Sequence, residues 1–292
     1  MTSPLAGSIS ATMAPTEFVT AGGVDFAYRR LGRAAQVPLV MLQHFRGNLD
    51  NWDPALIDAM TTDREVIVVD YPGVGRSSGE PDRTIAAVAR QMLGFIGALG
   101  LDRVDLLGFS VGGFVAQEIA LVRPSLVRRL VLAATGPKGA PGMHGWRDDI
   151  ATAARGETKP ENLLYIMFAP SPASQAKGVE FLGRFLERHE DRDLPTTDAA
   201  RDAQYDAIVE WGIPDHGALQ RLTGIQSPAL ILQGDADRMI PPKVSHLIAG
   251  LIPDAVIRIY PDAAHGFLFQ YPAEVARDVN AFLAGDDGAD RS

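Results

Sequence analysis

The stretch from Arg103 to Gln117 constrains the fold of this chain more than any other. It reads R-V-D-L-L-G-F-S-V-G-G-F-V-A-Q, in which a short apolar run of strand length leads into Gly-Phe-Ser-Val-Gly and then into apolar residues at helical spacing. Ser110 therefore lies where a strand turns directly into a helix. Gly108 and Gly112 flank it at positions where a side chain would collide with neighbouring backbone. Such a turn either projects the serine above a sheet or uses it only to cap the helix, and other segments of the chain distinguish the two.

Strand-like and helix-like segments alternate on both sides of this turn. Besides the strand before Ser110, we expect strands near residues 18–20, 24–30, 38–43, 65–70, 129–134, 228–233 and 255–260. Helices are expected near residues 53–60, 84–99, 242–251 and 273–283. Alternation of this kind indicates a mostly parallel sheet with helices on both faces. The fold class that the sequence predicts is therefore α/β, with a doubly wound sheet.

The alternation is interrupted between residues 136 and 217. No strand-like run of any length occurs there. Helix-like pieces broken by glycine and proline are expected instead, at residues 146–154, 161–168, 173–189 and 198–211. We interpret this block as a helical insertion over the carboxyl edge of the sheet. The expected division is a core of residues 16–135 and 218–284, an inserted helical lid at 136–217, and disordered tails at 1–15 and 285–292.

Charge and composition exclude several classes of partner. The 292 residues carry a formal net charge of −9, which argues against nucleic acid or an anionic membrane. No apolar segment approaches the length of a membrane span, and residues 1–15 lack the basic start and apolar run of a signal peptide, so we expect a cytoplasmic protein. Cysteine is absent, which excludes disulfides, a thiol nucleophile and sulfur ligands for a metal. We expect a small-molecule partner and a monomer or homodimer.

A serine on such a turn becomes a nucleophile only when a base accepts its proton and a carboxylate orients that base. His265 lies in a loop directly after the last expected strand, where an imidazole can reach a serine at the carboxyl edge of the sheet. His44 ends a strand at the position of a residue that shapes an oxyanion loop. The other histidines lie in the helical block or on helix-like segments, where surface or lid-packing roles are simpler: His144, His189, His216 and His246. His265 is therefore the predicted base.

The acid should also follow a strand, and the segment Gln233–Pro241 offers two aspartates. Asp235 is close to the strand end, where an aspartate commonly hydrogen-bonds the amides of its own loop. Asp237 lies further along, before the helix expected from residue 242. The order serine, acid, histidine along the chain is the one expected for such a turn. We favour Asp237 on that order together with the family resemblance described below.

Acyl transfer also requires hydrogen-bond donors where an oxyanion forms, and losing one such donor typically lowers the rate by about 10²–10³-fold. One donor would be the main-chain N–H of Val111, directly after Ser110. The other would come from the loop after the strand at 38–43, most naturally the N–H of Phe45. Because both donors are main-chain groups, the Phe45 side chain is free to pack against the lid.

Taken together, these segments resemble the α/β-hydrolase family over residues 17–285. The resemblance is carried by five segments: His44–Gly47, Asp70–Ser77, Gly108–Gly112, Gly234–Asp237 and His265–Phe267. They are most similar to lidded esterases, lactonases and cofactor-free haloperoxidase-like (perhydrolase) enzymes. The resemblance implies an eight-stranded sheet, a helical lid at 136–217, and Ser110, Asp237 and His265 as a catalytic triad. It also implies no cofactor and no metal ion.

Residue 45 departs from this family pattern. The corresponding loop commonly reads His-Gly-x-x, whereas Phe45 and Arg46 follow His44 here, so a side chain should narrow the oxyanion end of the site. We expect Arg46 to be a rim residue paired with Asp50 or Asp53, an exposed contact of ~0–1 kcal/mol. Alternatively, Arg46 meets a substrate carboxylate or a polar leaving group.

The expected activity is hydrolysis of a carboxylic ester or lactone through an acyl-Ser110 intermediate. The substrate pocket is expected to be mostly apolar and to be lined by Arg46, Phe109, Met143, Trp146, Phe168, Phe181, Trp211 and Phe267. Those that lie in the helical block could equally form the core of that block. Perhydrolases, peptidases and carbon–carbon bond hydrolases of this family share the triad and remain open. Epoxide hydrolases and dehalogenases of this fold are disfavoured, because in those enzymes the corresponding turn carries aspartate where this chain has Ser110. A non-catalytic ligand receptor or scaffold on the same fold is the other alternative.

Overall fold

The computed structural model describes residues 9–285, so the tail residues 1–8 and 286–292 lie outside it. Within the described range, eight strands form one sheet in the order β1-β2-β4-β3-β5-β6-β7-β8. Strand β2 runs antiparallel to both β1 and β4, and the other neighbouring pairs are parallel. The predicted fold class, a doubly wound and mostly parallel eight-stranded α/β sheet, is confirmed.

Each strand is a short segment, and nearly all residues of the central strands are buried because helices cover both faces of the sheet. The strands are β1 (Glu17–Ala21), β2 (Val24–Leu31), β3 (Leu39–Leu42), β4 (Val66–Val69), β5 (Val104–Phe109), β6 (Val127–Ala133), β7 (Ala229–Gly234) and β8 (Ala255–Tyr260). Because β3 to β8 are parallel, their carboxyl ends meet at one edge of the sheet. That edge is where the loops with His44, Ser110, Asp237 and His265 begin.

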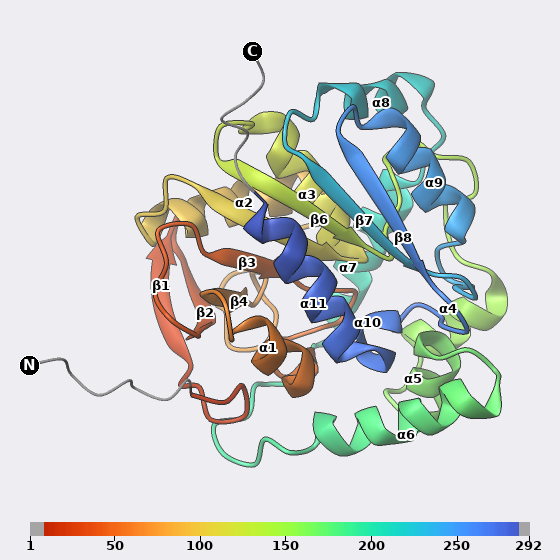
Figure 1. The fold of residues 1–292 in the computed structure, drawn as a ribbon, viewed down its shortest axis with the longest axis horizontal. Helices are drawn as coiled ribbons and strands as arrows, with labels where there is room; N and C mark the ends of the chain where they lie inside the picture. Colours follow the sequence, from red (N-terminus) through yellow and green to blue (C-terminus); the bar gives the residue numbers. More distant parts are fainter. Residues whose placement is uncertain (1–8, 286–292) are drawn as a thin grey trace, which may run out of the picture.

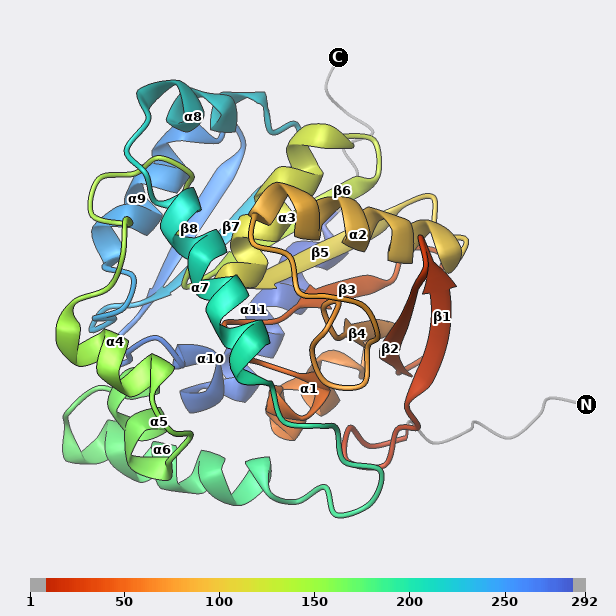
Figure 2. The same ribbon diagram turned by 180° about the vertical axis from the view of Figure 1, so that it is seen from behind.

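Helices cover the two faces of this sheet. Outside the long connection between β6 and β7, they are the 3₁₀ turn η1 (Leu49–Asn51), α1 (Pro54–Met60), α2 (Ile85–Ala98), α3 (Val111–Val122), α9 (Pro242–Leu251), α10 (Phe267–Gln270) and α11 (Pro272–Ala284). Helices α1 and α11 pack against each other in front of the strands in Figure 1. Helices α2 and α3 pack together on the opposite face, as Figure 2 shows. Helix α9 packs against β7 and β8.

The connection between β6 and β7 contains helices and loops but no strand, and all of its residues are described. Its helices are α4 (Asp148–Arg155), α5 (Pro160–Met167), α6 (Pro172–Phe185), α7 (Asp198–Trp211), α8 (His216–Gln220) and the 3₁₀ turn η2 (Arg221–Gly224). We refer to residues 136–217 of this connection as the helical insertion; α8 crosses its C-terminal boundary. In both ribbon views α5 and α6 lie together, next to α10 and away from the sheet (Figures 1 and 2).

Residues 9–15 differ from the expected disordered tail. The N–H of Ala11 donates to the Asp58 carboxylate of α1 at 2.7 Å. The Arg188 guanidinium donates to the carbonyls of Ala11, Thr12 and Ala14, and Ala14 is fully buried. Contacts to residues far along the chain therefore hold this segment against the protein, and its small, polar composition does not reveal them.

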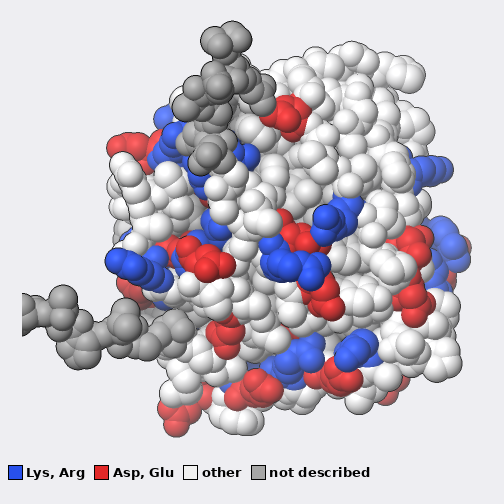
Figure 3. All heavy atoms as spheres, viewed as in Figure 1, with Lys and Arg blue, Asp and Glu red and all other residues white. Residues whose placement is uncertain are grey.

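Both signs of charge are distributed over the surface. Figure 3 shows Lys and Arg beside Asp and Glu on the face that carries α1 and α11, with no extended field of one sign. On β8, for example, Arg258 pairs with Asp278 of α11 at 2.5 Å. Within residues 9–285, every helix is too short or too polar to cross a membrane.

Candidate functional site

Ser110 lies at the turn from β5 to α3, in a backbone conformation that residues other than glycine rarely adopt. Its φ is 56° and its ψ is −116°, and such a conformation persists only where surrounding contacts impose it. The Ser110 N–H donates to the Ala133 carbonyl at 2.8 Å, and the Ser110 carbonyl accepts from the Thr135 hydroxyl at 2.7 Å. The serine side chain makes no capping hydrogen bond to α3. The helix-capping alternative is therefore wrong, and the hydroxyl is available for another role.

The flanking glycines allow β3, β5 and α3 to approach one another closely. A Cβ at Gly112 would lie 2.0 Å from the Leu42 carbonyl oxygen, and a Cβ at Gly108 would lie 2.3 Å from the Gly112 carbonyl oxygen. Both contacts are with main chain, so no side-chain rotation relieves them. The steric reason inferred from the sequence for these two glycines is confirmed.

His265 and Asp237 form a buried, hydrogen-bonded pair. His265 Nδ1 lies 2.8 Å from Asp237 Oδ2, and the two side chains are 1% and 0% exposed. Because a carboxylate only accepts, Nδ1 carries the proton, and Nε2 of the neutral ring remains an acceptor. Asp237 also accepts from Gln233 Nε2 at 2.9 Å and from the N–H groups of Met239 and Ile240 at 2.8 and 2.9 Å. Four hydrogen bonds therefore hold the carboxylate beside the ring.

Asp235, the alternative acid, contacts the loop after β8, whereas the sequence indicated hydrogen bonds to the amides of its own loop. Its carboxylate accepts from the Ala263 N–H at 3.2 Å, whereas the Asp237 carboxylate contacts the imidazole of His265. Ser110 and His265 line the same cavity. The structure thus brings together the three residues that the sequence predicts as nucleophile, acid and base.

The loop after β3 carries His44 and Phe45. His44 Nδ1 lies 2.8 Å from the Phe45 carbonyl oxygen, so this nitrogen carries a proton. Burial lowers the pKa of His44 to about 4, against the opposing effect of that hydrogen bond, so the ring is neutral near pH 7. In the part of the chain that the structure describes, neither the Phe45 N–H nor the Val111 N–H has a hydrogen-bond partner. These are the two groups that the sequence predicts as oxyanion donors.

A cavity of about 730 Å³ is lined by Ser110, His265, Phe45 and Arg46. Its size is within the range of small-molecule sites, which is roughly 300–1,000 Å³. Much of its wall consists of apolar side chains from α5, α6, α10 and the loop after β7: Leu163, Ile166, Met167, Phe181, Leu182, Phe185, Met239 and Phe269. Polar side chains line the remainder, including Asn48, Asp50, Asn51, Lys159, Asn162 and Arg192.

Several aromatic residues predicted to line the pocket belong to the core instead. Trp211 stacks on Phe114 of α3 with ring centroids 5.2 Å apart, and its indole N–H donates to the Gly136 carbonyl. Phe267 stacks on Tyr260 of β8 with ring centroids 4.9 Å apart. Trp211 packs between α7 and α3, and Phe267 packs against β8. Neither ring lines the cavity, so the predictions that Trp211 and Phe267 line the pocket are wrong.

Phe109 and Met143 also lie outside the cavity lining. Phe109 is fully buried beneath the site, with its ring centroid 5.1 Å from that of His44 and 5.3 Å from that of His265. It supports the two imidazole rings from below and does not reach the cavity. Met143 is buried close to Gly136, on the side of Trp211.

Phe168 and Trp146 lie behind residues that do reach the cavity. The Phe168 ring packs against Phe181, with centroids 5.8 Å apart, and Phe181 lines the cavity. Trp146 packs edge-on against Phe45, with centroids 5.0 Å apart. Of the block residues proposed for the pocket, Phe181 alone belongs to the lining of this described cavity.

Most of the apolar wall is formed by residues that were not predicted from the sequence. In α5 they are Leu163, Ile166 and Met167, which share one helix face because they are three and four residues apart. In α6, Phe185 lies four residues after Phe181, which the sequence did predict, and shares its helix face. This spacing is visible in the sequence and identifies an apolar face, but it does not say whether the face meets a cavity or another helix.

Arg46 pairs with neither Asp50 nor Asp53, so the preferred interpretation of Arg46 is wrong. Asp50 is bound to Arg29 of β2 at 2.7 Å. Asp53 caps the N-terminus of α1 and is bound to Arg184 of α6 at 2.7 Å. Other arginines occupy both carboxylates, and the guanidinium of Arg46 donates to oxygen atoms of the helical insertion.

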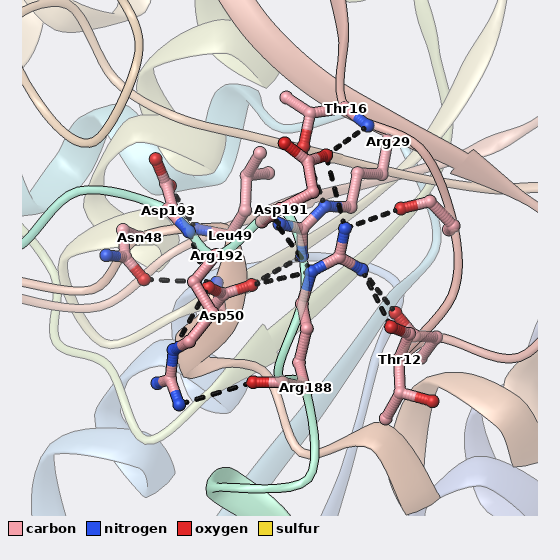
Figure 4. Close-up of polar contacts among 12 residues, drawn as sticks. Thr12, Thr16, Arg29, Asn48, Leu49, Asp50, Arg188, Asp191, Arg192 and Asp193 are labelled. Atoms are coloured by element: carbon pink, nitrogen blue, oxygen red, sulfur yellow. Dashed lines mark hydrogen bonds and ion pairs between the residues drawn. The ribbon is translucent and has the colours of Figure 1, made fainter.

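Asp50 lies at the centre of a charged cluster that also lines the cavity, shown in Figure 4. Its carboxylate lies 2.7 Å from Arg29, 3.6 Å from Arg188 and 4.0 Å from Arg192, and it accepts from the Asp193 N–H at 2.7 Å. Three arginines therefore surround one carboxylate that is 5% exposed. The cluster joins β2 and the loop after β3 to the segment that follows α6.

Asp70, after β4, and Asp193, in the helical insertion, share one donor. The Leu49 N–H lies 2.8 Å from Asp70 Oδ1 and 3.2 Å from Asp193 Oδ2. Burial, followed by the hydrogen bond and charge of Asp193, raises the pKa of Asp70 well above its usual range. The two carboxyl groups therefore favour retaining a proton between them. Within residues 9–285, no group of three or more His, Asp and Glu side chains is arranged to hold a metal ion.

The strand order and the arrangement of Ser110, Asp237 and His265 around one sheet edge are typical of the α/β hydrolases. The family model for the alpha/beta hydrolase fold matches residues 37–272 of this chain. The chain therefore belongs to the α/β-hydrolase family, and the resemblance inferred from the sequence is confirmed.

Relatives of known structure or curated name agree with this assignment. An alpha/beta hydrolase fold protein from Chitinophaga pinensis is 38% identical, with a TM-score of 0.91 and coverage of 95% of this chain and 100% of that one. A poly(3-hydroxyalkanoate) depolymerase of Ectopseudomonas oleovorans is 30% identical over 87% of this chain and 87% of its own length. A pimeloyl-(acyl-carrier protein) methyl ester esterase of Serratia marcescens is 26% identical over 84% of this chain and 93% of its own length. The family and these relatives support hydrolase activity.

Proposed function

We propose that this protein is a serine hydrolase that cleaves a carboxylic ester or lactone through an acyl-Ser110 intermediate. His265 Nε2 accepts the Ser110 hydroxyl proton while Oγ bonds to the substrate carbonyl carbon. The tetrahedral intermediate then breaks its bond to the leaving oxygen, which takes that proton from His265. Water completes the cycle: it gives a proton to His265, its oxygen bonds to the acyl carbon, and Ser110 departs with the proton.

The observation that carries this proposal is the buried His265–Asp237 pair beside the cavity that Ser110 lines. Asp237 would fix the ring with Nε2 as acceptor and stabilise the imidazolium that forms during each step. The unpartnered N–H groups of Phe45 and Val111 would bind the oxyanion. They are suited to this role because a hydrogen bond to a substrate oxygen would replace no existing contact.

The helical insertion would act as the lid over this site. Helices α5 and α6 supply apolar side chains to the cavity wall, which suits an apolar acyl or alcohol group. The names of two relatives, a poly(3-hydroxyalkanoate) depolymerase and a methyl ester esterase, support an ester as the substrate class. Turnover of a panel of aryl esters, lactones and amides of increasing chain length would define that class.

Covalent labelling tests the nucleophile directly. A fluorophosphonate should add once to the protein, at Ser110, and mass spectrometry of the digested adduct locates it. Ser110→Ala should lose both labelling and ester turnover while its unfolding curve stays close to that of the wild type. Labelling at another serine, or undiminished turnover in Ser110→Ala, would refute the proposal.

The two aspartates of the loop after β7 provide a matched test of the acid. Asp237→Asn should lower kcat by about 10³–10⁴-fold, because the imidazole loses its orientation and its counter-ion. Asp235→Asn should mainly lower the free energy of unfolding, by about 1 kcal/mol, through its weakened hydrogen bond from the Ala263 N–H of the loop after β8. Steady-state kinetics and urea unfolding of both variants decide the assignment, and the reverse pattern would move the acid to Asp235.

A further inference from the structure

Arg46 binds the loop after β3 to the helical insertion. Its guanidinium donates to the carbonyls of Ala154 and Gly156 at 3.0 and 2.8 Å and to the Thr158 hydroxyl at 2.9 Å. The two carbonyls lie at the C-terminal end of α4, where unpaired oxygens and the helix dipole favour a cation. Main-chain oxygens, rather than a carboxylate, therefore accept the hydrogen bonds of this charge.

The main chain of Arg46 is bound to the insertion as well. Its N–H donates to Gln204 Oε1 of α7 at 2.7 Å, and its carbonyl accepts from the Thr196 hydroxyl at 2.7 Å. Its φ of 63° lies in the left-handed region that favours glycine, so these contacts hold the backbone in a conformation that the chain alone would seldom adopt. Every hydrogen bond of Arg46 within residues 9–285 comes from the helical insertion.

These contacts determine the surroundings of the Phe45 N–H, one residue earlier. The peptide that joins Phe45 to Arg46 is held on both sides, because its carbonyl accepts from His44 Nδ1 at 2.8 Å and its N–H donates to Gln204. The Phe45 ring is packed edge-on against Trp146 of the insertion. Little freedom remains for the unpartnered Phe45 N–H while these contacts last.

We propose that Arg46 is a positioning residue: by binding the helical insertion, it holds the Phe45 N–H where the oxyanion of the tetrahedral intermediate forms. The inference rests on the proposed acyl-Ser110 chemistry, and it makes the insertion a contributor to transition-state stabilisation as well as a wall of the cavity. Because the full oxyanion exists only in the transition state and the intermediate, loss of Arg46 lowers kcat more than it raises KM.

Two substitutions of Arg46 separate its side chain from its backbone. Arg46→Gly removes the guanidinium and accommodates the positive φ, so backbone strain does not obscure the result. Arg46→Lys keeps the charge but offers one ammonium group to three acceptors that a planar guanidinium spans. Arg147→Ala is the control, because Arg147 is an insertion arginine that is 68% exposed and pairs with Asp149.

Each variant is assayed with 4-nitrophenyl butyrate and with an alkyl trifluoromethyl ketone, whose adduct with Ser110 mimics the tetrahedral intermediate. In Arg46→Gly, kcat should fall about 10–100-fold with KM changed less than about threefold, a part of the loss expected from removing a whole oxyanion donor. The inhibition constant of the ketone should rise by the same factor as kcat/KM falls. Arg46→Lys should lie between Arg46→Gly and the wild type, and Arg147→Ala should match the wild type. Unchanged ketone affinity, or a loss confined to KM, overturns the proposal.

Hydrogen exchange measures the anchor without turnover. Amides of residues 44–47 should exchange faster in Arg46→Gly than in Arg147→Ala, and equal exchange overturns the proposal. If Arg46→Gly does not fold, Thr158→Val removes one acceptor of the same guanidinium and should give the same kinetic pattern at smaller size; absence of that pattern counts against Arg46. A wild-type protein that neither hydrolyses the ester nor binds the ketone would refute the proposed function itself. Failure of the Arg46 inference alone looks different, because the wild type is then active and Arg46→Gly keeps its ketone affinity.

Discussion

Replacement of Asp50 by asparagine tests how strongly the charged cluster of Figure 4 holds the helical insertion on the core. The substitution keeps the size of the side chain and one oxygen for the Asp193 N–H, but it removes the charge. Arg29 and Arg188, which are 4% and 7% exposed, then lose the buried carboxylate that lies between them.

The size of the effect follows from which partners remain. Neutralising one member of a buried ion pair costs about 3–5 kcal/mol, because the other charge is left uncompensated. Arg188 keeps the Asp191 carboxylate at 3.3 Å and four main-chain carbonyls. Arg29 keeps the Thr16 hydroxyl at 3.2 Å and the Asp191 carbonyl at 3.4 Å. These remaining contacts place the expected loss for Asp50→Asn near the lower limit, at about 3 kcal/mol.

Asp191→Asn is the matched control, because Asp191 meets Arg188 and Arg76 of the same region but is 41% exposed. An exposed pair contributes ~0–1 kcal/mol, so this variant should lose no more than that. Urea unfolding followed by circular dichroism gives both free energies, with the denaturant slope as a check that the unfolding transition is unchanged. A loss in Asp50→Asn below about 1 kcal/mol, or equal to that of Asp191→Asn, would refute the argument that burial decides the strength of these pairs.

Three further outcomes are expected from urea unfolding. Gly112→Ala should lower the free energy of unfolding by about 3 kcal/mol or more, because its Cβ would meet a main-chain oxygen at 2.0 Å. Gly250→Ala in α9 has open space and should leave that free energy unchanged or raise it by up to ~1 kcal/mol, and equal effects of the two variants would contradict this reasoning. Because the pKa of His44 is lowered, only the unfolded chain binds a proton at this residue between about pH 6.5 and about pH 4. The free energy of unfolding of the wild type should therefore fall by up to about 3 kcal/mol across that range, and His44→Gln should lack this pH dependence. The raised pKa of Asp70 makes the wild type less stable as pH rises above about 4, because the unfolded chain releases this proton first. Asp70→Asn should therefore gain stability relative to the wild type over that range, and parallel pH profiles of unfolding free energy would refute this prediction.

The turn of Ser110 and the His265–Asp237 pair could be located from the sequence because short-range rules determine their places. Glycines at fixed offsets mark the turn, and each of the three residues follows a strand end within a few positions. Parallel strands bring those ends to one edge of the sheet, so their proximity needs no knowledge of side-chain packing. Position relative to the strand end does not distinguish Asp235 from Asp237, because both lie just beyond β7, so the choice also depended on the family resemblance.

The cavity wall could not be predicted in the same way. Trp211 and Phe181 are both aromatic residues on insertion helices, yet Trp211 stacks on Phe114 of the core and Phe181 lines the cavity. An apolar helix face is equally satisfied by either partner, so periodicity does not distinguish them. Arg46 shows the same limit for polar residues, because its acceptors Ala154 and Gly156 lie more than a hundred positions along the chain and are main-chain atoms without a sequence signature.

Arg46 and Ser110 are two non-glycine residues with positive φ, and they follow the neighbouring strands β3 and β5. Ser110 is held by Ala133 of β6 and by Thr135 just beyond that strand, so the sheet itself fixes the nucleophile. Arg46 is held by the helical insertion, through Gln204 and the carbonyls after α4. The Ser110 turn and the Phe45 N–H therefore have separate supports. Loosening the insertion should leave the Ser110 backbone and the Val111 N–H in place, and it should selectively remove the transition-state stabilisation that depends on the Phe45 N–H.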